Sequence, residues 1–202
     1  MTQVAPALPR AALRGVASGV CFMAFFGTLW ASIGVGGVGG WAAPWPTVVV
    51  LLIGVVLLGG AVSLWRGSGR LRDVAMEGGD NTGRWFGIVF ALEGAAIAIA
   101  SVVCNATGHF DRFFPIMALI VGIHFLPLAR LFQVGMYYLT GALLCLVGIV
   151  ALLAVPVNAT LGGQAIMARW LVVGGGCAVI LWVTALLLWM QGARALRAAL
   201  RA

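Results

Sequence analysis

Six long apolar stretches constrain this chain more than any other feature of its sequence. A transmembrane helix needs about 20 predominantly apolar residues, because the hydrocarbon core of a bilayer is about 30 Å thick. Hydrophobic residues make up 63% of the 202 residues and charged residues only 8%, which excludes a water-soluble globule. We therefore predict an all-α fold, a polytopic transmembrane bundle of six helices in a single domain over residues 1–202. The predicted spans are residues 16–33, 45–65, 85–104, 113–131, 134–155 and 170–190.

The boundary between the fourth and fifth spans is the weakest of the five. Only Arg130 and Gln133 interrupt an almost continuous apolar run there. A single helix over both spans would need about 40 residues and would be too long for the bilayer core. We therefore predict a tight turn near residues 129–135, for which Gly135 is suited.

The arginines predict the orientation of the bundle. All 12 basic residues are Arg, and an inside N-terminus leaves only Arg112 and Arg169 outside. Cytoplasmic loops of membrane proteins carry such an excess of basic residues. The exclusive use of Arg, with much Ala, Gly, Val and Leu, is typical of a GC-rich bacterial genome. We therefore expect both termini in the cytoplasm, in a multi-pass protein of the bacterial cytoplasmic (inner) membrane whose partner is the lipid bilayer. The same bias explains the net charge of +7 without nucleic acid, so nucleic acid is not an expected partner.

The connectors between the spans are short. Residues 34–44 are rich in glycine and carry no charge, which predicts a flexible loop. Residues 66–84 form the one sizeable polar segment, with Asp73, Glu77 and Asp80 among four arginines, and we expect a solvated connector. Neither connector leaves room for an extramembrane enzyme domain. The first span is long enough to remain as an anchor, so we do not expect its removal as a signal peptide.

Glu93 is the one acidic residue inside a predicted span, the third. His124 in the fourth span lies at nearly the same depth, with each residue roughly 9 to 12 Å from the cytoplasmic end of its span at 1.5 Å per residue. A charge inside the bilayer is costly and is by default a functional candidate with a partner. A carboxylate beside an imidazole could share a proton, as in a proton relay or a coupled binding site. Tyr137, Tyr138, Thr140 and Thr184 lie near this depth and would complete a candidate polar site open to the cytoplasm. The alternative is that the two tyrosines are interfacial residues.

The sequence leaves three interpretations of Glu93 and His124 open. They could form a functional site, they could be a structural hydrogen-bonded pair, or they could face different neighbours. Pro127 follows His124 by one turn and removes a backbone donor, which predicts a helix kink beside the polar residues. Such kinks mark hinges or sites in some membrane helices and serve packing in others.

Other chemistry finds little support in the sequence. The motifs G-x-S-x-G and H-E-x-x-H are absent, so we do not expect an enzyme. The four cysteines are widely separated, and His109 and His124 lie near opposite ends of the membrane, so we expect no metal site and no cofactor. Asp111 and Arg112 are expected to form a solvated interfacial pair. Gly174 and Ala178 have the small-xxx-small spacing that supports close helix packing, either within the chain or in a homo-oligomer.

The segment from Phe113 to Tyr138 carries a resemblance to other proteins. It contains Phe113-Phe114-Pro115, then Gly122-Ile123-His124-Phe125-Leu126-Pro127-Leu128, and finally Tyr137-Tyr138. This pattern resembles a segment of small bacterial multi-helix integral membrane proteins of unknown function. The resemblance implies that the His-Phe-Leu-Pro segment is a family feature, and it implies no activity.

Two classes of function follow from these features. One is a small-solute or proton-coupled permease that uses Glu93 and His124. The other is a non-catalytic membrane scaffold or stress-response protein in which the pair is structural.

Residues 191–202 should continue the sixth helix, with Arg194, Arg197 and Arg201 on one face. That face would either anchor at an anionic lipid surface or act only as a topology signal.

The orientation can be tested with single cysteines at positions 38, 75, 108 and 160 in a cysteine-free background. A membrane-impermeant thiol reagent added to intact cells should label positions 38, 108 and 160 and should spare position 75. Labelling of position 75 under these conditions would contradict the expected orientation.

Overall fold

The computed structural model describes residues 9–40, 44–71 and 80–201 and shows an all-α bundle, as the sequence predicts. Six helices are long and apolar enough to cross a membrane. The polar connector predicted over residues 66–84 lies partly outside the described residues, including Asp73 and Glu77. The helices are α1 (Arg10–Val38), α2 (Pro44–Ser68), α3 (Asp80–Ala106), α4 (Phe113–Phe132), α5 (Met136–Leu153) and α6 (Ala168–Ala199).

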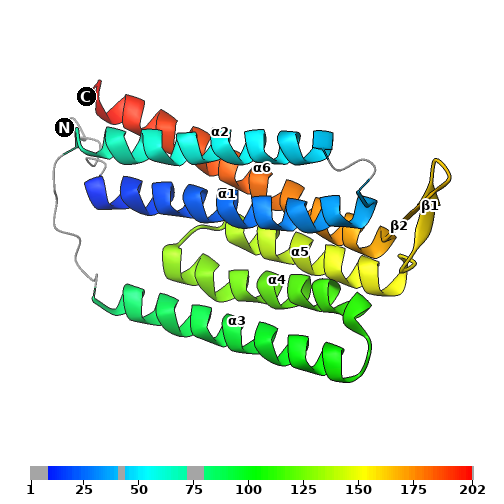
Figure 1. Cartoon of the computed structure of the whole chain (residues 1–202). Coiled ribbons are helices and arrows are strands. Elements are labelled where there is room, and N and C mark those ends of the chain that lie inside the picture. Colours follow the sequence, from blue (N-terminus) through cyan, green and yellow to red (C-terminus); the bar gives the residue numbers. More distant parts are fainter. Residues whose placement is uncertain (1–8, 41–43, 72–79, 202) are drawn as a thin grey trace.

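The helices lie side by side with α1 and α6 at the centre (Figure 1). Helix α2 packs against α1 and α6, and α5 lies on the other side of α6. Helix α4 pairs with α5, and α3 lies at the edge against α4. The described ends of the chain lie at one end of the bundle, as an even number of spans requires (Figure 1). We call this the arginine-rich end, because α1 and α3 begin there with Arg10, Arg14 and Arg84, and α6 ends there with Arg194 and Arg197.

Glycines allow α1 and α6 to approach each other closely. Gly34 of α1 faces Gly174 and Gly175 of α6, and a Cβ atom on Gly34 would lie 2.9 Å from the backbone nitrogen of Gly175. The flexible loop predicted from residue 34 is therefore wrong over its first part, because α1 continues to Val38. Close helix packing in a membrane favours small residues, and here it outweighs the low helix propensity of glycine.

A tight turn joins α4 to α5 where the sequence predicts one. The residue with left-handed backbone conformation is Gln133, with φ of 55°, whereas Gly135 has φ of −58°. The Gln133 side chain donates a hydrogen bond to the carbonyl oxygen of Arg130 at 2.7 Å. This bond satisfies one of the carbonyl groups left open at the end of α4, and glycine is not required at this turn.

The opposite end of the bundle carries a hairpin that the sequence analysis missed. Strands β1 (Ala159–Leu161) and β2 (Gln164–Ile166) are antiparallel and project beyond the helices (Figure 1). Gly162 and Gly163 connect them with φ of 57° and 82°, and such two-residue turns favour glycine because both φ angles are positive. The next residue after β2, Met167, donates its backbone N–H to Gly37 of α1 at 2.8 Å. We call this the hairpin end.

Helix α3 is the least enclosed of the six. None of the residues in its most apolar 18-residue window is buried, whereas 33–44% are buried in the corresponding windows of the other five helices. Apart from the short 3₁₀ helix η1 (Phe110–Arg112), its extensive packing is against α4 alone. The position of α3 therefore depends on a small number of contacts.

Replacing Gly34 with alanine tests the close approach of α1 and α6. The new methyl group meets backbone rather than a flexible side chain, so we expect a loss of about 1–3 kcal/mol in the free energy of unfolding. Gly36→Ala is the matched control, because no atom lies within 4 Å of its Cβ position. Thermal or denaturant unfolding in detergent would measure both, and equal stability of the two variants would contradict the close packing.

Candidate functional site

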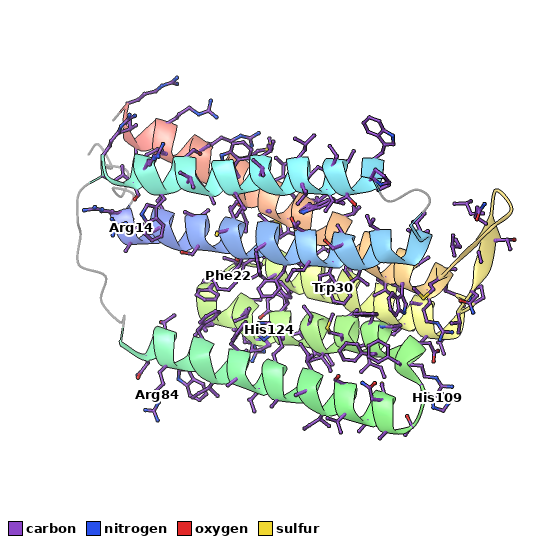
Figure 2. All side chains as sticks on the ribbon, in the orientation of Figure 1. Arg14, Phe22, Trp30, Arg84, His109 and His124 are labelled. Atoms are coloured by element: carbon purple, nitrogen blue, oxygen red, sulfur yellow. The ribbon has the colours of Figure 1, made fainter. Side chains whose placement is uncertain are left out.

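Glu93 and His124 meet at the interface of α3 and α4. The distance from Nδ1 of His124 to Oε2 of Glu93 is 3.4 Å. The two side chains are only 9% and 11% exposed for His124 and Glu93 respectively. His124 lies between the ribbons of α3 and α4 (Figure 2). Of the three interpretations left open by the sequence, the one in which Glu93 and His124 face different neighbours is therefore excluded.

The geometry of this pair is that of a loose polar contact. A hydrogen bond between nitrogen and oxygen usually measures about 2.9–3.0 Å, so 3.4 Å is long. Nδ1 of His124 is buried and makes no hydrogen bond to any described residue. The polar groups that interact with the imidazole are the Glu93 carboxylate and the backbone of Val89, both on α3. A small movement of α3 could tighten the contact to a hydrogen bond or break it.

Aromatic rings surround the pair on the side of the arginine-rich end. Phe90, one turn before Glu93 on α3, places its ring centroid 6.4 Å from that of His124. Phe86 stacks near Phe90 and contacts Phe132 of α4 at 5.8 Å. Phe22 lies on α1 (Figure 2), and its ring centroid is 6.1 Å from that of Phe86. This aromatic cluster, Phe22, Phe86, Phe90 and Phe132, was not recognised in the sequence. The spacing of Phe86, Phe90 and Glu93 along one helix face was the available signal.

The tyrosines do not join the pair in one site. Tyr137 is buried, with its ring 5.6 Å from Phe125 and its hydroxyl group directed at Gly19 of α1. Tyr138 is exposed on α5. Within the described chain, neither tyrosine makes a hydrogen bond or a ring contact with Glu93 or His124. The expected polar site therefore does not include the two tyrosines. Similar depth in the membrane does not ensure contact, because helix rotation decides which side chains face each other.

Pro127 lies within α4, and the helix continues from Phe113 to Phe132 through it. Proline has no backbone N–H, so the carbonyl group of Ile123 lacks its usual helical partner. The Ile123 carbonyl belongs to the peptide bond that joins Ile123 to His124, so the weakened turn of the helix includes His124. The structure thus places Pro127 near His124 without a break in the helix, and the kink stays a prediction.

A second ion pair holds the hairpin end together. Nη1 of Arg169, at the start of α6, donates to Oδ2 of Asp111 at 2.5 Å. Nε and Nη2 of Arg169 donate to the carbonyl oxygen of Val155 at 3.3 and 3.0 Å. The expected pairing of Asp111 with Arg112 is therefore wrong, and Arg112 is exposed. Asp111 and Arg112 are consecutive residues of the 3₁₀ helix η1, so their side chains point in different directions. Arg169 instead reaches Asp111 from the start of α6.

Two hollows formed by the described residues lie away from the polar pair. One of about 280 Å³ lies on α6, and one of about 120 Å³ lies between α1 and α2. Neither is lined by Glu93 or His124. Within the described ranges, no three His, Cys, Asp or Glu side chains are grouped as metal ligands, and all four cysteines are free.

Comparisons with protein-family models, with curated proteins and with solved structures gave no match for this chain.

Replacing Arg169 with methionine tests the ion pair at the hairpin end. The substitution keeps much of the apolar stem but leaves Asp111 and the Val155 carbonyl without their donor. We expect a loss of about 1.5–3 kcal/mol in unfolding free energy, which is typical of hydrogen bonds to charged groups. Arg112→Met, which removes an exposed charge from the same end, should change the stability by less than about 0.5 kcal/mol. Equal losses in both variants, measured by unfolding in detergent, would rule out a special role for Arg169.

Proposed function

We propose that this protein is a proton-coupled permease for a small solute in the bacterial cytoplasmic membrane. Glu93 and His124 form its proton-binding site. The single observation that carries the proposal is the enclosed contact of a carboxylate with an imidazole nitrogen that has no hydrogen-bond partner among the described residues. Charged residues within transmembrane segments are rare, and they often mark ion or proton pathways.

The protonation chemistry of the pair supports this role. With one proton on the pair, either both groups are neutral or an imidazolium faces a carboxylate, and the net charge is zero. Loss of that proton leaves an uncompensated carboxylate in a medium of low dielectric constant, which is strongly unfavourable. Binding and release of a proton therefore change the free energy of the contact between α3 and α4. No other charged side chain lies in the apolar parts of these two helices.

The loose packing of α3 supports coupling of this chemistry to movement. An enclosed helix would be held by many contacts that a proton could not alter. Helix α3 instead packs mainly against α4, and its apolar window has no buried residues. A proton can bias a conformational equilibrium only through a difference in affinity between two states. A contact of 3.4 Å on a loosely held helix provides such a difference, because a shift of less than 1 Å makes or breaks a hydrogen bond.

A second candidate function is a non-catalytic membrane scaffold. It is favoured by the positions of the two hollows described above, neither of which is lined by Glu93 or His124. The interior between α5 and α6 is also closed by a hydrogen bond of 2.9 Å between the hydroxyl groups of Thr140 and Thr184. In this case the pair would fasten α3 to α4 and would have no role in transport.

The substitution Glu93→Gln separates the two functions. The amide keeps the shape and hydrogen bonding of the carboxylate but cannot bind the proton. In proteoliposomes with a pH gradient, a permease should lose more than about 90% of its proton flux, as expected for general acid–base groups that contribute 10²-fold or more. The melting temperature in detergent should stay close to that of the wild type. Glu77→Gln, in the predicted cytoplasmic connector, is the matched control and should keep the flux.

Glu93→Ala gives the complementary result. It leaves the buried His124 nitrogen without its polar neighbour, and we expect a loss of about 1–3 kcal/mol in unfolding free energy. If Glu93→Gln melts like the wild type and still carries a normal flux, Glu93 has no part in the mechanism. If the wild type carries no flux above empty liposomes, the scaffold is the better proposal.

A further inference from the structure

A hollow on α6 combines an apolar part with a cationic part. Its volume is about 280 Å³, and six side chains of one helix line it. We call it the α6 hollow. Its lining residues are Leu186, Trp189, Met190, Ala193, Arg194 and Arg197.

The two parts of the α6 hollow follow one another along the axis of α6. Leu186, Trp189 and Met190 come first along α6, within the apolar span, and Arg194 and Arg197 follow toward the arginine-rich end. At 1.5 Å per residue, the lining extends over about 16 Å. A phospholipid has the same order and scale, with acyl chains in the membrane core and a phosphate at the boundary.

Arg194 and Arg197 have guanidinium N–H groups that are available to a ligand. Other arginines of the chain use these groups in contacts within the protein. Arg169 is occupied by Asp111 and Val155, and Arg14 lies over the ring of Trp65 with its Nε 3.4 Å from Ser68. Arg197 donates only its Nε, to the carbonyl oxygen of Ala193 at 3.2 Å. This bond orients the guanidinium group and leaves its terminal nitrogens available. No carboxylate of the described residues forms an ion pair with Arg194 or Arg197.

We propose that the α6 hollow binds an anionic phospholipid, with its phosphate group on Arg194 and Arg197 and an acyl chain along Leu186 and Met190. Planar guanidinium groups recognise phosphate by paired hydrogen bonds. Inorganic phosphate shares the chemistry of the headgroup, but it would leave the apolar part of the hollow uncovered. This site is more specific than attraction of the C-terminal segment to a charged surface. It is independent of Glu93 and of transport.

Fluorescence quenching by brominated phosphatidylglycerol tests the site in the purified full chain. The signal of Trp189, which lines the hollow, is the difference between the wild type and Trp189→Phe. A hydrogen bond contributes about 1 kcal/mol net, which corresponds to about a fivefold change in affinity for each arginine that bonds the phosphate directly. Arg194→Gln with Arg197→Gln should therefore raise the apparent Kd for phosphatidylglycerol about 25-fold. The matched control, Arg66→Gln with Arg70→Gln, removes the same charge from the same end of the bundle and should change the Kd less than about twofold.

Equal weakening by both double variants would show a general charge effect and would overturn the proposal, as would unchanged binding in the first. A comparison of two lipids, with the Trp189 signal again taken as the difference between the wild type and Trp189→Phe, provides a test that does not depend on the arginine variants. Brominated phosphatidylglycerol should quench Trp189 at about 25-fold lower concentration than brominated phosphatidylcholine, and equal potency would overturn the site. Excess inorganic phosphate should not displace the lipid. Displacement would identify free phosphate as the ligand and would contradict a lipid site.

Discussion

Lipid offers no hydrogen bonds to the backbone, and this constraint determines the architecture. Every N–H and C=O group in the membrane core has to be paired within the protein, so the chain crosses as helices. Lipid tails are also as apolar as leucine, so helices gain little from hiding apolar side chains and associate through close packing instead. In this protein the closest packing is between α1 and α6, where Gly34 meets Gly174. The other helices are arranged around that contact, and α3, which has no such partner, stays at the edge.

Much of the fold was predictable because the length of an apolar stretch is a local property. The six helices, the turn between α4 and α5 and the helical continuation beyond residue 190 agree with the sequence analysis. The two errors in the predicted fold both concern glycine residues. At Gly34 its low helix propensity was outweighed by a contact with a helix 140 residues away, which no local pattern reveals. At Gly162-Gly163 the opposite occurred, because this pair is a known signal for a two-residue hairpin turn and was overlooked.

The depth of the candidate site residues in the membrane could be predicted from the sequence. The direction in which each side chain points from its helix could not. Residue counting placed Glu93, His124 and Tyr137 at similar heights, and the structure brings only the first two together. Rotation about the helix axis depends on packing along the whole helix, which a single sequence does not determine. The partner of Asp111 was also missed. The hairpin end has one carboxylate and two arginines, and the choice of Arg169 depends on how α4 and α6 meet.

The unequal lengths of the helices have a consequence for the membrane itself. Helix α6 has 32 residues and extends about 48 Å at 1.5 Å per residue, whereas α5 has 18 and extends only about 27 Å. The hydrocarbon core is about 30 Å thick, so α5 is slightly shorter than the layer it crosses. Lipids next to a short helix thin locally to match it. A bilayer that adapts to this protein is therefore thinnest beside α5, whereas α4, with 20 residues and a length of about 30 Å, matches the hydrocarbon core.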